Sequence, residues 1–328
     1  MTDYSTLAIP ALALLMVVEI VSFRFFPDKD KAGYTVRDTL TSLAMGIGSV
    51  VANLGWNALT LVSLVFVHQF TPLRIPFSWV GWLLTFVAYD LTYYWQHRAS
   101  HRIRILWAGH VAHHSSQRFN LSTGFRISWT AIGTMPIMFP MVLLGFHPVM
   151  ILATQSINFT YQFWLHTERV DRLWAPVEWL FNTPTHHRVH HSSTDLHLDR
   201  NFGGVFIVWD RLFGTLPSKD DRPVYGLTHN IDTYNPLRVT FHEYAAIARD
   251  LVRVRGLVTR LGILLAPPAW SHDAVRAART ETPADGQAAA APAAPTDGAA
   301  VPSLTAGRRS RPAAQSEGNA TSPRSWPR

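Results

Sequence analysis

The sequence predicts an all-α membrane protein, with about four transmembrane helices or hairpin segments and a cytoplasmic helical cap that carries a histidine-rich dimetal site. Its composition, 48% hydrophobic with only 16% charged residues, is typical of a chain embedded in lipid. Several apolar stretches reach the roughly 20 residues needed to cross a bilayer. Histidines at helical spacing follow these stretches, and this arrangement indicates a metal site at the membrane face.

Three apolar stretches are expected to cross the bilayer once each, namely Leu7–Phe23, Leu43–Val67 and Phe77–Trp95. A fourth stretch, Ile132–Phe163, is too long for one ordinary span. Gly145 and Pro148 interrupt it near the middle, so we expect a helical hairpin there.

The loop charges predict the orientation, because lysine and arginine near span ends stay on the cytoplasmic side. The loop after the first span carries Arg24, Lys29, Lys31 and Arg37, whereas the loop after the second carries only Arg74. With residues 24–38 inside, every histidine cluster and the C-terminus also fall on the cytoplasmic side.

The chain divides into two parts by composition. Residues 1–279 are predicted to form the membrane-embedded domain, and the first apolar stretch is expected to be retained because no basic region precedes it. Alanine, proline, glycine, serine and threonine dominate 280–328, which predicts a disordered cytoplasmic tail. The formal charge of +7 flanks apolar spans, so we expect contact with anionic lipid headgroups and no nucleic-acid partner.

Nine of the sixteen histidines form three boxes, His97-Arg-Ala-Ser-His101, His110-Val-Ala-His113-His114 and His186-His187-Arg-Val-His190-His191. Spacings of three and four residues place side chains on one helix face, so each box can aim two or three imidazoles at a common point. The other histidines are scattered, as expected of histidines without a shared task. His166, at the end of the predicted hairpin, either adds a ligand from a fourth direction or contacts a lipid headgroup.

The number of histidines predicts two metal ions, since a single zinc site needs only three or four protein ligands. The chain has no cysteine, so thiolate and iron–sulfur sites are excluded. No HExxH motif of a zinc protease is present, and the boxes are too dense for haem ligation. A histidine-rich dimetal site beside acyl chains suits iron-dependent oxygen chemistry on lipid. The alternative is a membrane metal-binding or transport protein, which would place its ligands midway through the spans.

The boxes, together with Asn201-Phe-Gly-Gly204 and Trp209-Asp-Arg-Leu-Phe-Gly-Thr215, resemble the fatty acid hydroxylase and sterol desaturase superfamily over residues 80–230. Within it, residues 106–126 and 181–191 are most similar to the alkylglycerol monooxygenase branch and its bacterial relatives. The resemblance implies a nonhaem di-iron hydroxylase or desaturase that uses dioxygen and a separate electron donor. Its substrate would be a membrane lipid (fatty acyl, sterol or ether lipid), and its location a bacterial inner membrane.

The resemblance also implies the metal ligands. They are His97, His101, His110, His113, His114, His166, His187, His190 and His191. Arg102 and Gln117 stand where the ether-lipid enzymes are expected to carry acidic residues, which leaves the pterin cofactor and the alkylglycerol substrate open.

Four further residues are candidates for supporting the ligands. Asp90 lies two helical turns before His97, where it would contact the metal site or form a structural ion pair. His186 would orient a ligand or be a bystander on its helix. Asp199 and Asn201 would hydrogen-bond to ligand imidazoles or cap a helix.

Overall fold

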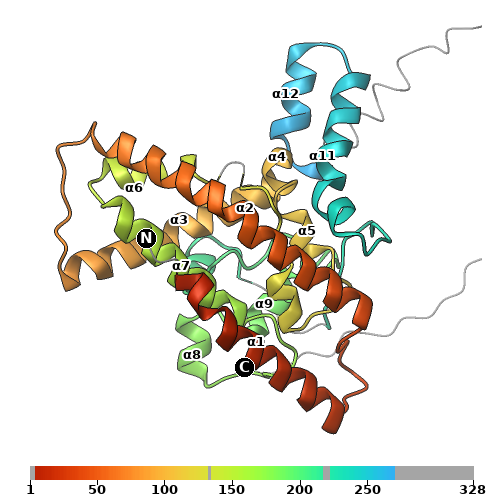
Figure 1. Cartoon of the computed structure of the whole chain (residues 1–328). Helices are drawn as coiled ribbons and strands as arrows, with labels where there is room; N and C mark the ends of the chain where they lie inside the picture. Colours follow the sequence, from red (N-terminus) through yellow and green to blue (C-terminus); the bar gives the residue numbers. More distant parts are fainter. Residues whose placement is uncertain (1–3, 132–133, 217–221, 270–328) are drawn as a thin grey trace, which may run out of the picture. The chain divides into compact units, whose positions relative to one another are not determined.

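A computed structural model describes residues 4–131, 134–216 and 222–269. Over these residues the fold is all-α, and pairing between extended segments is limited to isolated bridges, Phe181 with Phe206 and Ser192 with Tyr225. The longer helices are α1 (Tyr4–Phe25), α2 (Val36–His68), α3 (Trp79–Arg102), α7 (Pro148–Phe163), α11 (Pro236–Arg253) and α12 (Leu257–Leu265) (Figure 1). The shorter ones are α4 (Arg104–Trp107), α5 (Val111–His114), η1 (Leu121–Phe125), η2 (Pro136–Met138), α6 (Phe139–Leu143), α8 (Ala175–Leu180), α9 (Pro184–His190) and α10 (Val208–Leu212). The predicted tail at 280–328 and the predicted boundary at 279 lie outside the described residues.

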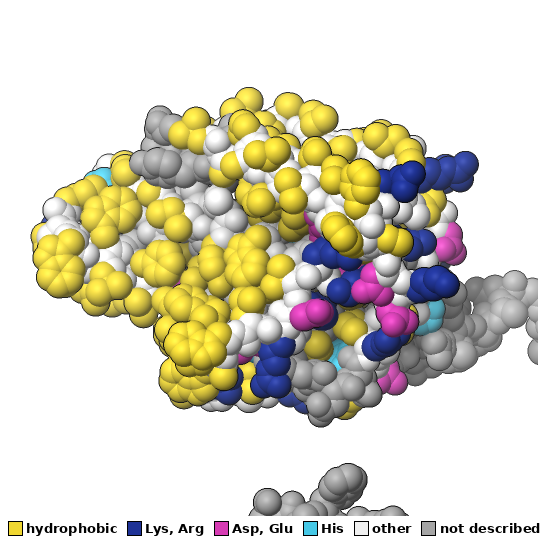
Figure 2. Space-filling model, turned by 90° about the horizontal axis from the view of Figure 1, so that it is seen from below, with side chains coloured by type: hydrophobic (Ala, Val, Ile, Leu, Met, Phe, Trp, Pro, Cys, Tyr) yellow, Lys and Arg dark blue, Asp and Glu magenta, His cyan; other side chains and the backbone are white. Residues whose placement is uncertain are grey.

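Two of the described helices, α1 and α2, are long and apolar enough to cross a membrane. Most of their apolar side chains point away from the protein, as shown by Leu14, Ile47 and Leu54, which are 64%, 70% and 73% exposed. In Figure 2 hydrophobic side chains cover one part of the surface almost without interruption, and charged side chains gather at the opposite end. A soluble protein rarely exposes so large an apolar area, which makes this a membrane protein.

The third predicted span is a helix, but it is longer and more polar than expected. Helix α3 continues seven residues past Trp95, to Arg102, and so carries the whole first histidine box. Its buried face includes Tyr89, Asp90 and Tyr93, which pack towards α7 and the segment after α9. The side chain of Ser78 accepts the N–H of Gly81 and so caps the start of the helix.

The predicted hairpin is interrupted at Gly145, the position that the sequence indicated. Gly145 adopts a φ of 92°, which favours glycine, and its carbonyl accepts the N–H of Ile75 at 2.9 Å. His147 then caps α7, and Pro148 occupies its first turn. The five-residue α6 and sixteen-residue α7 are shorter than an ordinary span of roughly 20 residues. The structure therefore has two short helices, separated at Gly145, over the stretch in which a helical hairpin was predicted.

Helix α7 contacts α1, α2 and α3, and its residues Ile151 and Leu152 share an apolar core with Leu64 of α2 and Tyr89 of α3. A buried carboxylate fastens α1 to this core: Glu19 accepts hydrogen bonds from Tyr34, Thr167 and the backbone N–H of Leu121, the last at 2.8 Å. These contacts hold α1 and η1 next to the chain that follows His166.

The short helices α4, α5, α8, α9 and α10 follow the ends of the long helices. Buried ion pairs join segments of this region that are far apart in the sequence. Arg126 pairs with Asp38 at the start of α2, at 3.0 Å. Arg104 of α4 pairs with Glu243 and Asp250 of α11, at 2.7 and 2.8 Å. Removing one member of such a pair would leave a buried charge uncompensated. The first pair therefore fixes the segment after η1 to α2, and the other two fix α4 to α11.

Candidate metal centre

Nine histidines meet in the interior, and they are the nine ligands that the resemblance implied. They form two groups, and within each group the candidate ligand atoms lie within 4.8 Å of one another. We call them the five-histidine cluster and the four-histidine cluster. The five-histidine cluster consists of His97, His101, His110, His114 and His190. The four-histidine cluster consists of His113, His166, His187 and His191.

The first box and the second use helical spacing differently. His97 and His101, four residues apart on α3, both point into the five-histidine cluster. In the second box His110 and His114 point into the same cluster, while His113 points into the other. Consecutive residues of a helix differ by about 100° in direction, so the short helix α5 aims neighbouring side chains at two different points.

The third box also contributes to both clusters, but its larger share belongs to the four-histidine cluster. His187 and His191 belong to the four-histidine cluster, and His190 between them belongs to the five-histidine cluster. Each box thus aims two imidazoles at a common point, as predicted, and the second and third boxes each send one further imidazole to the other cluster. Helices α5 and α9 therefore each contribute histidines to both clusters.

Burial keeps these imidazoles neutral. It lowers the pKa of His97 to about 3 and that of His166 to about 4. For His101, His110 and His114 burial lowers the pKa well below the usual range, and the neighbouring imidazoles lower it further. Neutral imidazole is the form that binds a metal ion.

Backbone carbonyls fix the tautomer of several rings. The Nδ1–H of His97 donates to the carbonyl of Phe202 at 3.1 Å, and that of His166 to the carbonyl of Phe163 at 3.2 Å. The Nδ1–H of His190 donates to the carbonyl of Arg200 at 2.9 Å. Because a carbonyl only accepts, the Nε2 atoms of these rings carry no hydrogen and present a lone pair to the cluster.

The distances between Nε2 atoms fit metal coordination. His110 Nε2 lies 3.1 Å from the Nε2 atoms of both His97 and His114. His166 Nε2 lies 3.1 Å from the Nε2 atoms of both His113 and His187. Two nitrogens that each lie about 2.1 Å from one ion are about 3.0 to 3.4 Å apart.

Three further Nε2 atoms, those of His101, His190 and His191, are buried without a hydrogen-bond partner among the described residues. Leaving such atoms unpaired is costly in a protein interior. A cation in each cluster would satisfy these atoms and the facing lone pairs, so the residues present fit two metal ions.

A segment of four consecutive residues, 199–202, supplies acceptors for three of the nine histidines and lies close to a fourth. The carbonyls of Arg200 and Phe202 accept from His190 and His97 as described above. The side chain of Asn201 places Oδ1 3.4 Å from Nδ1 of His187, and Asp199 places Oδ1 3.9 Å from Nδ1 of His101. Asp199 also pairs with Arg102 at 3.1 Å. Asp199 and Asn201 thus lie beside ligand imidazoles, and neither caps a helix in the described structure.

The backbone of this segment is unusual, since Asp199 and Asn201 have φ values of 58° and 59°. Residues other than glycine rarely adopt this left-handed backbone conformation without support. Here Asp210 supplies the support, because its buried carboxylate accepts the N–H groups of Phe202 and Gly203, both at 2.8 Å, and the hydroxyl of Thr215 at 2.7 Å. Burial raises the pKa of Asp210 to about 6. Sequence reasoning missed this residue, although it lies in the quoted Trp209-Asp210 motif.

Asp90 neither forms an ion pair nor contacts a cluster histidine among its described hydrogen bonds. Its carboxylate accepts the N–H groups of Val205 and Phe206 at 2.8 and 3.0 Å, the indole N–H of Trp209 at 2.9 Å and the amide of Asn158 at 2.6 Å. Both expectations for Asp90 were therefore wrong. Three of its donors come from residues that follow the segment 199–202 and the fourth comes from α7, so Asp90 anchors the chain after that segment to α3 and α7.

His186 lies on α9 but outside both clusters. Its Nδ1 is 3.1 Å from the hydroxyl of Thr183, and its Nε2 is 3.5 Å from a carboxylate oxygen of Glu178. The same Nδ1 accepts the backbone N–H of Thr183 at 3.3 Å, which is part of a capping box at the start of α9. His186 therefore fixes the start of the helix that carries His187 and His190.

Comparison with known proteins now bears on this site. The model of the Fatty acid hydroxylase family matches residues 82–215, a range that contains all nine cluster histidines and Asp210. Residues 82–215 form a fatty acid hydroxylase domain. The expected superfamily is thereby confirmed.

Three relatives of the chain are named for activities on lipids. Human alkylglycerol monooxygenase is 35% identical over 271 residues, which cover 82% of this chain and 60% of the relative. The ornithine lipid hydroxylase of Rhizobium tropici is 30% identical over 44% of this chain and 45% of its own length. Human cholesterol 25-hydroxylase is 29% identical over 41% of this chain and 50% of its own length. The chain thus spans about half to three fifths of the relatives that it matches, and no solved structure matches it.

Proposed function

We propose that this chain is a nonhaem di-iron, dioxygen-dependent hydroxylase of a membrane lipid. The observation that carries the proposal is the pair of adjacent clusters, with five and four neutral imidazoles, inside a fatty acid hydroxylase domain. Imidazole suits iron as well as zinc, copper and nickel, and the family favours iron. Two bound iron ions would supply the activation of dioxygen and the oxidation of a C–H bond.

The protein's own contribution is to hold, orient and shield. The nine histidines would bind the metal ions, and the segment 199–202 orients three of the rings through their Nδ1 atoms. Buried apolar side chains such as Phe119 and Phe202 pack against the cluster rings and exclude water. Exclusion of water strengthens the electrostatic interactions inside the site and suppresses side reactions.

The proposed substrate is a lipid within the same bilayer. The three reported relatives act on an alkylglycerol, an ornithine lipid and cholesterol according to their names, which supports hydroxylation over desaturation. The exposed apolar faces of α1 and α2 would place the site one helix end away from acyl chains. The electrons are proposed to come from a separate donor.

The proposed topology keeps the predicted orientation. The helices α1, α2 and α3 and the broken segment α6–α7 would cross or enter the membrane, and the short helices with both clusters would form a cytoplasmic cap. The positively charged loop between α1 and α2 supports this orientation.

The test is metal content together with oxygen-dependent turnover. The full-length chain, purified in mild detergent under reducing conditions and loaded with Fe²⁺, should contain close to two iron ions per chain. It should convert extracted membrane lipid to an oxygenated product only in the presence of dioxygen and a reductant. One bound ion, or two with no lipid product under any donor, would contradict the proposal.

A further inference from the structure

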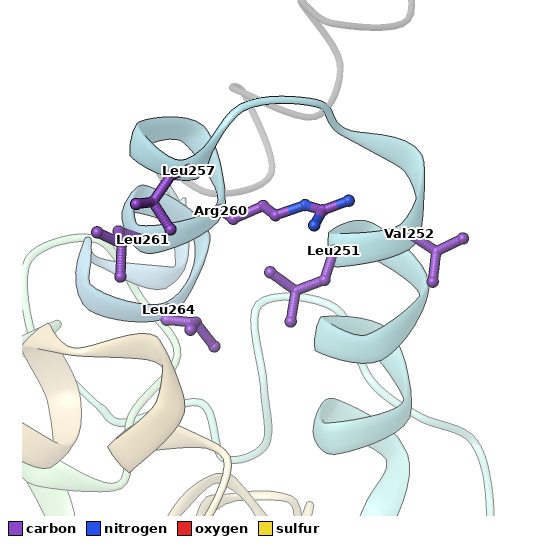
Figure 3. Close-up of a pocket in the computed structure, with 6 residues that line it drawn as sticks. All are labelled: Leu251, Val252, Leu257, Arg260, Leu261 and Leu264. Atoms are coloured by element: carbon purple, nitrogen blue, oxygen red, sulfur yellow. The ribbon is translucent and has the colours of Figure 1, made fainter.

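The C-terminal hairpin of α11 and α12 lies outside the matched domain and has a surface of its own. Val252, Leu257 and Val258 are 84%, 72% and 85% exposed. Leu251, Val252, Leu257, Arg260, Leu261 and Leu264 line an open apolar groove between the two helices (Figure 3). Gly256, with a φ of 86°, makes the turn between them. A surface this apolar is unfavourable in water, which indicates that something covers it.

The charges beside this surface have one sign. Between Thr233 and Ala269 the sequence holds two acidic residues, Glu243 and Asp250, and both point inward to Arg104. All arginines of the same stretch are exposed. They are Arg238, Arg249, Arg253, Arg255 and Arg260. The hairpin therefore presents leucine and valine side chains flanked by uncompensated positive charge.

The attachment of the hairpin places it level with the ends of the long helices. Val239 of α11 packs on Met45 in the first part of α2. The carbonyl of Ala266, just after α12, accepts the N–H of Arg104, which immediately follows α3, at 3.1 Å. A membrane boundary passes through the ends of membrane-spanning helices, so the hairpin lies where headgroups are expected.

We propose that the hairpin α11–α12 rests on an anionic lipid surface, with its exposed leucines and valines in the headgroup boundary and its arginines beside lipid phosphates. Apolar residues with flanking cations are the pattern of helices that lie in a membrane interface, and each basic residue near such a surface adds to binding. The inference rests on the membrane location of the proposed function. It assigns a task to residues that the proposed reaction does not use.

The absence of cysteine from the sequence allows a direct test. Val258→Cys, labelled with an environment-sensitive nitrobenzoxadiazole, is reconstituted as the full-length chain in vesicles of phosphatidylcholine with phosphatidylglycerol. The vesicles also carry lipid with a nitroxide on its acyl chain. The label should shift to the blue and be quenched by the nitroxide. Thr228→Cys, labelled in the exposed polar loop before α11, is the matched control and should show neither effect.

Charge dependence separates a lipid surface from other occupants. Adding Arg253→Gln and Arg255→Gln to Val258→Cys should weaken the association of the hairpin with anionic vesicles about fivefold per charge removed. Quenching equal to that of Thr228→Cys would overturn the inference. A blue shift without quenching would also overturn it, since the surface would then be covered by protein, such as a second copy. The iron content of the same preparations reports separately on the proposed function.

Discussion

His113 and His114 are adjacent in sequence, yet their imidazoles enter different clusters, with ring centroids 5.5 Å apart and ring planes at 84°. Helix α5 is only four residues long. One short helix thereby supplies histidines to two proposed metal ions, and α9 does the same with His187 and His190.

This division leads to a prediction for single variants. His113→Ala and His114→Ala should each lower bound iron and reduce turnover by more than about a hundredfold, the upper range for losing a mere supporting partner. The two variants should differ in the spectrum of the remaining metal, because one loses a ligand from the four-histidine cluster and the other from the five-histidine cluster. Metal analysis and spectroscopy of the purified variants measure both effects. His229→Ala, an exposed histidine, is the control, and full iron content in either cluster variant would contradict the proposed sites.

Asp210 is predicted to act as a positioning residue. Asp210→Asn keeps the size of the side chain but replaces one acceptor oxygen with a donor that faces the N–H groups of Phe202 or Gly203. The segment 199–202 should shift, and metal affinity should fall about 10- to 100-fold. Competition with a chelator measures that affinity. The exposed Asp30→Asn is the matched control, and unchanged affinity in Asp210→Asn would show that the turn does not depend on this carboxylate.

The metal-free protein should lose stability as the pH falls below 6.5. Burial lowers the folded-state pKa of His97 and His166 from the ordinary value of 6.5 to about 3 and about 4. Below 6.5 the unfolded chain therefore binds protons that the folded chain refuses, so unfolding becomes more favourable as the pH decreases. The loss of stability is absent well above pH 6.5, and it grows as the pH falls from 6.5 towards 4. Thermal unfolding of chelated protein in detergent between pH 8 and pH 5 measures it, and a Tm that stays constant over this range would refute the assignment of neutral buried rings.

The loop between α1 and α2 and the C-terminus are predicted to lie on the same, cytoplasmic side of the membrane. Tags after Lys31 and at the C-terminus should report the cytoplasm, and a tag at Arg74 the opposite face. Accessibility to a membrane-impermeant reagent in intact cells and in lysed cells distinguishes the sides. A C-terminus on the outer face would separate the clusters from the proposed cytoplasmic cap.

The sequence predicted the parts of this molecule that are encoded locally. Helical spacing within the boxes indicated where imidazoles converge, and Gly145 with Pro148 indicated the break before α7, because both signals depend on neighbouring residues. The lengths of α6 and α7 were not predicted, since apolar composition is the same for a span and for a buried helix of a bundle.

The rest of the site depends on contacts between distant segments. Asp90 binds groups 115 to 119 residues further along the chain, so its partners cannot be inferred from its position on α3. Which histidine of a box faces which cluster depends on where α5 and α9 pack, and spacing alone allows either choice. Glu19 of α1 likewise finds its partners Tyr34 and Thr167 only in the fold.

The segment 199–202 alternates along its length: Asp199 and Asn201 turn side chains towards imidazoles, at 3.9 and 3.4 Å, whereas Arg200 and Phe202 offer carbonyls. A substitution removes a side chain but leaves the carbonyl of the same residue in place. In a saturation mutagenesis screen, tolerance should therefore rise and fall with a period of two along these residues. The two carbonyl contacts that aim imidazoles would escape detection by such a screen, and replacement of the amide by an ester at the following residue would be needed to weaken them.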